Sequence, residues 1–199
     1  MPEPLIYYVR HGQTEWNVEG RLQGQRDSRL TAAGQLQAVR CGDILRDLIA
    51  REARDASAFD YVASPLGRAR DSMERLRQKL GLPVTGYRVD ARLQELAFGR
   101  WEGLAFSQLQ VTDPEAIAAR ERDKWNFTPP GGESYADLAA RVAAWRDNVT
   151  RDSIVVAHGG TARALMALYG VAGPEAAPLL DVEQGVVYRF APGPFARYA

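Results

Sequence analysis

The sequence predicts an α/β fold with three α/β/α layers around a mostly parallel, doubly wound central sheet. Two observations predict it: short apolar runs are each followed by an amphipathic helical pattern, and this alternation recurs along the 199 residues. Apolar runs without polar alternation are typical of strands that are buried on both faces. Strands that alternate with helices form parallel sheets covered on both sides. The length favours a single domain spanning residues 1–199.

Five segments are expected to be strands because they are short, apolar and bounded by turn-forming or polar residues. The first ends at Arg10-His11-Gly12, and the fourth breaks at His158-Gly159-Gly160. The expected strands are Leu5–Val9, Tyr61–Ala63, Val84–Tyr87, Ser153–Ala157 and Val186–Phe190.

Helices are expected where apolar residues recur at helical spacing behind a capping residue. Thr31 precedes a helix with an apolar face, and Ser64-Pro65 leads into a second helix that stops at Gly81. Ser134 can cap a third, and a fourth begins near Thr161. The apolar faces consist of Cys41, Ile44, Leu45 and Leu48; of Ala69, Met73, Leu76 and Leu80; and of Tyr135, Leu138, Val142, Trp145 and Val149. The Pro/Gly-rich segments 128–132 and 191–194 are expected to be turns.

Composition argues against several classes of partner. Lys plus Arg equal Asp plus Glu at 25 each, so no basic field attracts nucleic acid. No apolar run approaches the roughly 18 residues of a membrane span, and the chain opens with Glu3 rather than a basic signal region. We therefore expect no membrane association and a cytoplasmic location. The single cysteine, Cys41, has no intramolecular disulfide partner and is expected in the core.

The residues that follow the buried strands point to an anion site, because open α/β sheets bind ligands at the carboxyl ends of their strands. The only two histidines, His11 and His158, both stand at a strand end and precede a glycine, which lets a ligand approach the backbone. Arg10 adjoins the first, and Arg68 follows the second strand. A metal is disfavoured, because guanidinium groups repel cations and bind phosphate or carboxylate. We expect no metal and no cofactor.

Phosphoryl transfer at such a site also needs a proton donor for the leaving group. Glu95 follows the third expected strand and precedes a Gly99–Gly103 turn, which makes it the first candidate. Position alone does not rank Glu95 above Glu102 or Glu15.

Several motifs, in order, resemble those of the histidine phosphatase superfamily, also called phosphoglycerate-mutase-like. The resemblance extends to about Tyr169. The motifs are Arg10-His11-Gly12-Gln13-Thr14-Glu15-Trp16-Asn17, Gly20–Gly24 with Asp27, Leu30, Thr31 and Gly34, Ser64–Ala69, Glu95 with Phe98–Gly103, Pro130–Ser134, and Ala157–Gly160.

The resemblance implies that His11 accepts the phosphoryl group and that Glu95 donates and later removes the proton. It further implies that Arg10, Arg68 and His158 hold the phosphoryl oxygens. The catalytic set is therefore expected to be His11, Glu95, His158, Arg10 and Arg68. The residues expected to contact substrate are Arg10, Asn17, Gln23, Gly24, Arg68, Glu95, His158 and Gly159.

Three functions are compatible with these motifs: a phosphatase, a mutase and a non-catalytic phosphate-binding module. Mutases resembling this chain carry a longer insertion that shields phosphohistidine from water, whereas only residues 104–129 separate Gly103 from Pro130. We therefore expect a phosphatase. Retention of the whole catalytic set argues against the module. The expected partner is a small phosphorylated metabolite: a sugar phosphate, phosphoglycerate and α-ribazole phosphate are all compatible.

Residues 104–129 leave the substrate open. Their aromatic side chains form either a wall for the leaving group or ordinary core, and their cations form either a second phosphate site or a solvated face. The aromatic residues are Phe106, Trp125 and Phe127, and the cations, with the nearby Arg100, are Arg120, Arg122 and Lys124. Glu183-Gln184-Gly185 stands where many relatives have an Asn. The chain is expected to be a monomer or a homodimer.

Overall fold

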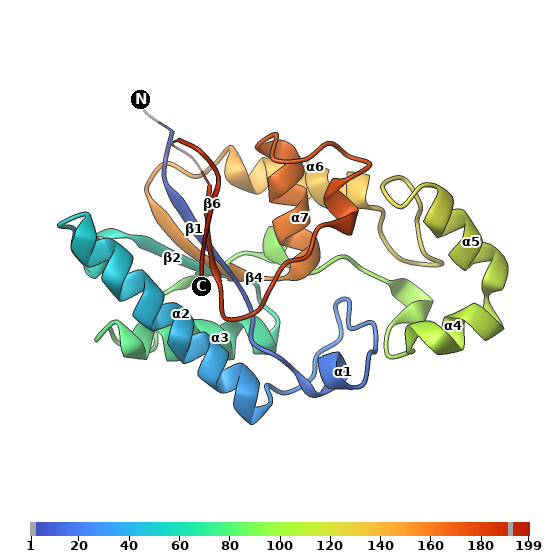
Figure 1. Cartoon of the computed structure of the whole chain (residues 1–199), viewed down its shortest axis with the longest axis horizontal. Helices are drawn as coiled ribbons and strands as arrows, with labels where there is room; N and C mark the ends of the chain where they lie inside the picture. Colours follow the sequence, from blue (N-terminus) through green and yellow to red (C-terminus); the bar gives the residue numbers. More distant parts are fainter. Residues whose placement is uncertain (1–2, 191–192) are drawn as a thin grey trace.

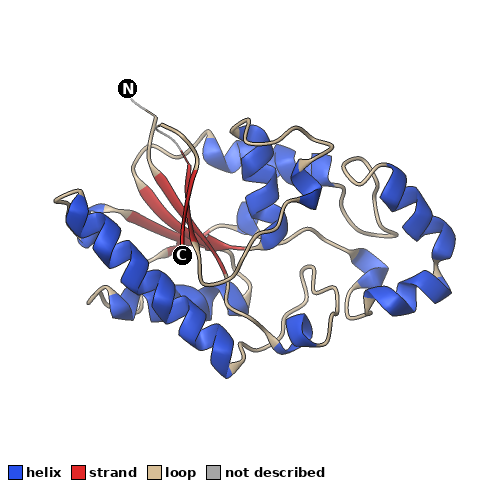
Figure 2. Ribbon diagram, in the orientation of Figure 1, coloured by secondary structure: helices blue, strands red, loops and turns tan. Residues whose placement is uncertain are grey.

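The structure is a computed structural model and describes residues 3–190 and 193–199. In this part of the chain six strands form one sheet with the order β3-β2-β4-β1-β5-β6 (Figure 2). Their bounds are β1 Ile6–Arg10, β2 Asp60–Ala63, β3 Arg88–Val89, β4 Ser153–Ala157, β5 Val187–Phe190 and β6 Ala196–Tyr198. The first four in spatial order are parallel, and β5 and β6 are antiparallel to their neighbours. The predicted α/β fold with a mostly parallel sheet is confirmed.

Helices cover both faces of this sheet (Figure 1). α2 (Ala32–Arg51) and α3 (Gly67–Lys79) lie on one face, and α6 (Tyr135–Arg146) and α7 (Gly159–Leu168) lie on the other. Alternate residues of β1 enter the two cores: Tyr7 and Val9 pack with α2 and α3, while Ile6 and Tyr8 pack with α6 and α7. This alternation explains why the central strands are apolar throughout.

A separate group of short helices, absent from the expectations, stands beside the layered part (Figure 1). It consists of α4 (Phe106–Thr112) and α5 (Pro114–Arg122), and it has its own small core of Trp101, Leu109 and Ile117. We call α4 and α5 the α4–α5 lobe. The remaining short elements are α1 (Glu15–Val18) and the 3-10 helices Ala56–Ala58, Ala91–Leu93, Gly99–Trp101 and Ala177–Leu179.

Three boundaries differ from the sequence expectations. The third strand is not 84–87 but Arg88–Val89, because Arg77 of α3 donates to the carbonyls of Pro83 and Thr85 and holds that segment against the helix. α7 begins at Gly159, directly after His158, rather than near Thr161. β6 was not expected at all.

The capping residues behave as predicted. Thr31 accepts a hydrogen bond from the Gly34 amide at 3.0 Å, and Ser134 forms a capping box with Asp137. Residues 128–132 form the expected turn, whereas the turn expected at 191–194 includes residues outside the described part.

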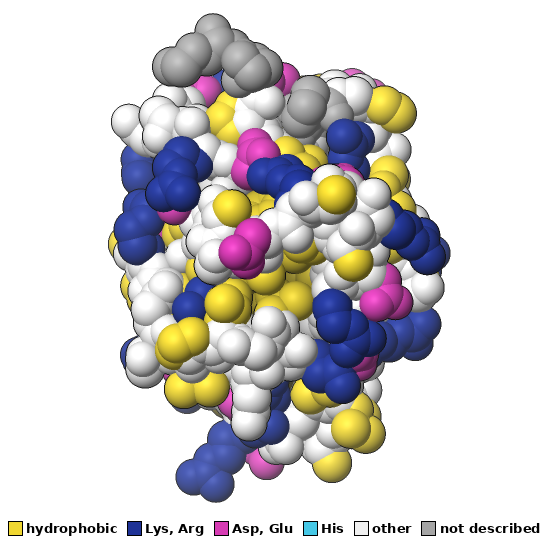
Figure 3. All heavy atoms as spheres, turned by 90° about the vertical axis from the view of Figure 1, so that its left-hand side faces the viewer, with side chains coloured by type: hydrophobic (Ala, Val, Ile, Leu, Met, Phe, Trp, Pro, Cys, Tyr) yellow, Lys and Arg dark blue, Asp and Glu magenta, His cyan; other side chains and the backbone are white. Residues whose placement is uncertain are grey.

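The surface agrees with the balanced composition. On the face in Figure 3, acidic side chains lie among the Lys and Arg side chains, and no imidazole is visible. No helix in the described residues is long and apolar enough to cross a membrane.

Candidate active site

The carboxyl ends of β1, β4 and β2 bring the two histidines together. Arg10 pairs with Ala157, so the residues that leave the two strands, His11 and His158, are neighbours. The His11 amide donates to the Ala157 carbonyl at 2.9 Å, and the imidazole centroids lie 5.2 Å apart. The expectation that these strand ends converge is met.

His11 turns its unprotonated nitrogen, Nε2, toward Arg68. Its Nδ1 lies 2.8 Å from the Gly12 carbonyl, and because a carbonyl can only accept, Nδ1 carries the proton and Nε2 is unprotonated. Nε2 accepts from Nε of Arg68 at 3.3 Å. Burial, followed by the charges of Arg68 and Arg10, lowers the pKa of His11 well below its usual value. The imidazole is therefore neutral, with an unprotonated Nε2.

Gly12 is required for a reason other than ligand approach. A Cβ at this position would overlap the backbone carbonyl of Gly34, at the start of α2. The Gly12 amide also donates to Ser72 of α3 at 3.1 Å. This glycine lets the strand end pack directly against the two helices that support His11.

Arg68 is buried and fixed on several sides. Its guanidinium donates to the carbonyls of Gly24 and Arg26 at 2.8 and 2.6 Å and to the Asp27 carboxylate at 3.0 Å. The side chain is 1% exposed, whereas that of Asp27 is 39% exposed. The loop 24–27 therefore holds the guanidinium beside His11.

Two buried side-chain nitrogens of the residues at these strand ends have no hydrogen-bond partner among the described residues. Arg10 donates from Nη1 to the Val182 carbonyl at 2.7 Å. Nε of Arg10 and Nδ1 of His158 are the buried side-chain atoms of the described residues that have no hydrogen-bond partner. Buried polar groups normally have partners, so these two atoms indicate the place of a ligand.

His158 is held through its backbone and its ring. The Tyr8 hydroxyl accepts from the His158 amide at 2.8 Å and donates to its carbonyl at 2.6 Å. Nε2 of the ring lies 2.7 Å from Oγ of Ser64. Burial, and then the charges of Arg68 and Arg10, lowers the pKa of His158 well below its usual value.

Glu95 reaches this site because residue 160 has no side chain. Its carboxylate accepts from the Gly160 amide at 3.2 Å, and a Cβ on Gly160 would overlap that carboxylate. Arg141 donates to the Glu95 carbonyl at 3.0 Å while paired with Glu133 at 2.6 Å, which anchors the loop to α6. Burial lowers the pKa of Arg10, and the Glu95 carboxylate is the largest of the charges that oppose this shift.

The other two glutamates of the expectation have different surroundings. The Glu102 carboxylate accepts from the amides of Gln25 and Phe98, so it joins two loops. Glu15 is exposed in the first turn of α1. Of the three, Glu95 is the one that the structure brings to the histidines.

The remaining residues expected to contact substrate differ in the contacts that they already make within the protein. Gln23 is 7% exposed and uses its amide to bind Thr14 and Ser28, so it supports the loop. Asn17 accepts from the Thr14 amide and from Gln184. Gly24 supplies a carbonyl to Arg68, and Gly159 opens α7 beside Arg10.

The Glu183-Gln184-Gly185 departure is also accounted for. The side-chain amide of Gln184 donates to Asn17 at 3.0 Å, which ties this loop to α1. The Glu183 amide donates to the Tyr188 hydroxyl at 2.7 Å.

The aromatic residues of 104–129 pack against other side chains of the protein. Trp101 stacks on Phe127 at 5.5 Å, and Trp125 stacks on Tyr135 of α6 at 6.1 Å. Phe106 is half-buried against the small core of the α4–α5 lobe.

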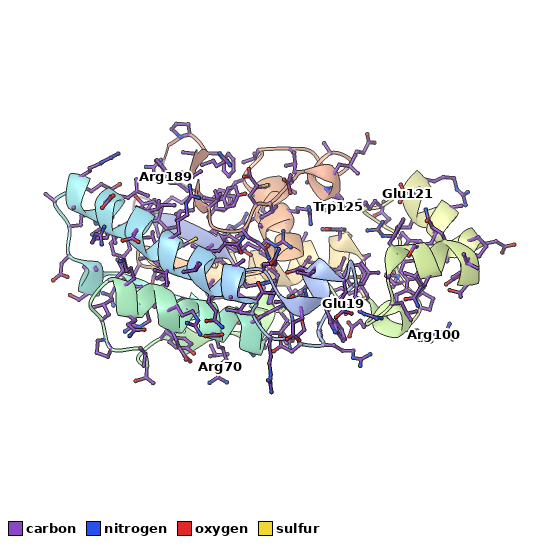
Figure 4. The ribbon with its side chains drawn as sticks, turned by 60° about the horizontal axis from the view of Figure 1, so that its bottom comes forward. Glu19, Arg70, Arg100, Glu121, Trp125 and Arg189 are labelled. Atoms are coloured by element: carbon purple, nitrogen blue, oxygen red, sulfur yellow. The ribbon has the colours of Figure 1, made fainter. Side chains whose placement is uncertain are left out.

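The cations divide into two groups. Arg100 and Arg122 are exposed, and Arg100 lies at the outer edge of the α4–α5 lobe in Figure 4. Arg120 and Lys124 are half-buried. Burial, Arg120 and Arg163 together lower the pKa of Lys124 to about 8.

Sequence reasoning missed Tyr8, Arg141 and the contact between Ser64 and His158. One signal was available: a tyrosine inside a buried strand needs a partner for its hydroxyl. Within residues 3–190 and 193–199, no group of three or more His, Cys, Asp or Glu side chains could hold a metal ion.

Comparison with known proteins agrees with this geometry. Residues 6–194 match the family model described as histidine phosphatase superfamily (branch 1). A glucosyl-3-phosphoglycerate phosphatase of Mycobacterium tuberculosis is 39% identical in an alignment of 176 residues that covers 81% of this chain and 73% of that protein. A Salmonella choleraesuis protein named "Probable phosphoglycerate mutase GpmB" is 38% identical over 139 residues, 70% of this chain and 60% of its own.

A solved structure supports the same assignment. The α-ribazole phosphatase of Shigella flexneri superposes with a TM-score of 0.79 at 25% identity, covering 93% of this chain and 89% of its own. The family match spans nearly the whole chain and includes both histidine motifs. The chain belongs to the histidine phosphatase superfamily, branch 1.

Proposed function

We propose that this protein is a metal-independent phosphatase that hydrolyses small phosphomonoesters through a phosphohistidine on His11, and that residues 1–199 act as one domain. The observation that carries the proposal is the neutral Nε2 of His11 beside two unpartnered buried atoms, Nε of Arg10 and Nδ1 of His158. A nucleophile next to free donors is the arrangement that phosphoryl transfer needs.

In the first step, the electron pair of His11 Nε2 forms a bond to phosphorus while the bond from phosphorus to the ester oxygen breaks. The leaving alkoxide takes a proton from the Glu95 carboxyl group. Arg10, Arg68 and His158 stabilise the charge on the phosphoryl oxygens. In the second step, water attacks phosphorus, Glu95 accepts its proton, and the N–P bond breaks to return the electron pair to His11.

Two guanidinium groups supply the positive charge that magnesium provides in kinase sites. Arg10 and Arg68 are both largely buried, so their attraction for a phosphoryl oxygen is weakly screened. Replacing either arginine by alanine should lower kcat about 100-fold, by analogy with loss of one preorganised oxyanion donor.

The direct test is hydrolysis of an aryl phosphate in EDTA by the wild type and by His11→Ala. Turnover by the wild type alone is expected, together with an acid-labile, base-stable phosphate trapped on the protein by rapid quenching. Full activity of a folded His11→Ala variant would refute the nucleophile. Loss of activity in EDTA that a divalent cation restores would refute metal independence.

The same experiment separates hydrolysis from transfer. A mutase would retain phosphohistidine until an acceptor alcohol arrives, whereas a phosphatase loses it to water within the turnover time. Phosphohistidine that persists and is discharged only by phosphoglycerate would favour the hypothesis that the protein is a mutase.

For the substrate, we propose a phosphomonoester that carries a carboxylate, such as glucosyl-3-phosphoglycerate. Two observations support this choice: the name of the Mycobacterium tuberculosis relative, and the half-buried cations Arg120 and Lys124, which an anion would neutralise. Arg120→Met and Lys124→Met should raise KM for the carboxylated substrate but not for an aryl phosphate. Arg122→Met, exposed on the same helix, is the matched control. Equal effects on both substrates would refute the proposal.

A further inference from the structure

The imidazole of His158 has one nitrogen in contact with the protein and one without a partner. Nε2 lies 2.7 Å from Ser64 Oγ, and Nδ1 is buried with no partner among the described residues. A neutral imidazole carries one proton, so the two tautomers have opposite consequences for an oxyanion. With the proton on Nδ1 the ring donates to it, and with the proton on Nε2 a lone pair repels it.

The surroundings of Ser64 distinguish the two tautomers. Ser64 follows β2 and is fully buried, and its amide donates to the Val156 carbonyl. Its hydroxyl oxygen accepts from the Leu66 amide at 3.4 Å. Among the hydrogen bonds of the described residues, the one acceptor available to the hydroxyl proton is Nε2 of His158. A buried hydroxyl whose proton has no acceptor is costly, so Ser64 donates to Nε2.

Only a neutral imidazole has a single protonated nitrogen, and the surroundings of His158 keep its ring neutral. His158 is fully buried, and the charges of Arg68 and Arg10 oppose a second proton, which together lower its pKa well below the usual value. Only one ring nitrogen is then protonated, and a donor on the Nε2 side places that proton on Nδ1.

The backbone of His158 is fixed independently of the ring. Tyr8 is fully buried in β1, and its hydroxyl contacts both the amide and the carbonyl of His158. Ala162 of α7 also donates to that carbonyl at 3.0 Å. These contacts fix the residue that carries the ring, so the hydrogen bond from Ser64 selects its tautomer rather than its location.

We propose that Ser64 is a positioning residue that holds His158 in the Nδ1–H tautomer, so that a buried N–H faces the bound oxyanion. The identity of that oxyanion as a phosphoryl group rests on the proposed function. The tautomer itself does not.

The test uses the fact that the chain contains only two histidines. In protein labelled with ¹⁵N-histidine, His11→Gln leaves one imidazole, which assigns His158. At neutral pH we expect its Nδ1 at the chemical shift of a protonated nitrogen and Nε2 at that of an unprotonated one. A wild-type spectrum with the proton on Nε2, or with both nitrogens protonated, would overturn the proposal without any variant of Ser64.

Variants then test whether the serine is the cause. Ser64→Ala should give a mixture of tautomers or the Nε2–H form, and orthovanadate should bind about 10-fold more weakly, since a partner that orients a ligand-contacting histidine commonly has an effect of this size. Ser64→Thr, which keeps a hydroxyl, should restore the Nδ1–H signature. Ser153→Ala, a buried serine at the opposite end of β4, is the control and should change neither quantity.

The outcomes separate this inference from the proposed function. An unchanged tautomer and unchanged vanadate affinity in Ser64→Ala would refute the role of Ser64 even if the protein is an active phosphatase. The expected tautomer and vanadate results without any phosphatase turnover would support the role of Ser64 and refute the proposed function.

Discussion

Acidification should destabilise this protein through its two buried histidines. In the folded state, burial and the adjacent guanidinium groups lower the pKa values of His11 and His158 well below 6.5. In the unfolded chain, both take up a proton near pH 6.5. The unfolded state therefore binds more protons in this window, and the free energy of unfolding falls as pH drops below about 6.5. The loss ends only below the folded-state pKa values.

The size of the loss follows from proton linkage. Between pH 7.5 and 5.5, protonation of one unfolded histidine lowers the free energy of unfolding by about 1.4 kcal/mol, and two give roughly 3 kcal/mol. For a chain of this length, that corresponds to a fall in Tm of very roughly 5–12 °C.

The assay is urea denaturation at several pH values in phosphate-free buffer, because a bound anion would stabilise the folded state. The double variant His11→Gln/His158→Gln removes every histidine from the chain, so the difference in slope between the two proteins isolates this effect from the carboxylates. Identical slopes in the two proteins between pH 7.5 and 5.5 would show that the folded imidazoles are protonated as readily as the unfolded ones. The proposal that His11 acts as a neutral nucleophile would then be wrong.

Three further outcomes test the supporting contacts. Gly160→Ala should displace the Glu95 carboxylate and lower kcat roughly 100-fold, the usual size of a general acid–base contribution, with little change in the urea midpoint. Asp27→Asn should weaken the anchoring of Arg68, and steady-state kinetics should give a roughly 10-fold lower kcat/KM, about 1.4 kcal/mol. Met73→Ala, in the fully buried core beneath α3, should reduce the free energy of unfolding by about 2–5 kcal/mol in urea titrations while kcat stays unchanged.

The strands that build the site were predictable because each is a continuous apolar run. Leu5–Val9, Tyr61–Ala63 and Ser153–Ala157 correspond to β1, β2 and β4 within one residue at each end. The third strand was misplaced because Val84 is apolar but exposed, and hydrogen bonds from Arg77 decide where pairing begins. Tertiary contacts of this kind produce no periodic pattern of apolar residues in the sequence.

The α4–α5 lobe was not predictable for a related reason. α5 contains a single buried residue, Ile117, so it has no apolar stripe of its own. Its core also depends on Trp101 and Phe127, which lie outside both helices. A helix that buries so little gives a weak helical signal in the sequence.

The candidate site likewise has one part that the sequence predicts and one part that only tertiary contacts determine. That Arg10, His11 and His158 converge follows from parallel strands whose carboxyl ends share one edge. The place of Glu95 does not follow, because it lies on a loop fixed by Arg141 and admitted by the missing side chain of Gly160. Sequence position therefore ranked three glutamates equally. The family resemblance favoured Glu95, and the packing of α6 and α7 explains how it reaches the site.

In the proposed mechanism, the two guanidinium groups serve both phosphate binding and the nucleophilicity of His11. There Arg68 and Arg10 carry the charge that attracts phosphoryl oxygens, and in the structure they are, after burial, the next largest causes of the low pKa of His11. Both effects come from positive charge in a site with little solvent, so neither can be removed alone. A neutral replacement of Arg68 should weaken oxyanion binding and also let His11 take a proton more readily. As the pH is lowered, the activity of such a variant should then begin to fall at a higher pH than that of the wild type. A guanidinium that acted only as a phosphate ligand would not produce this shift.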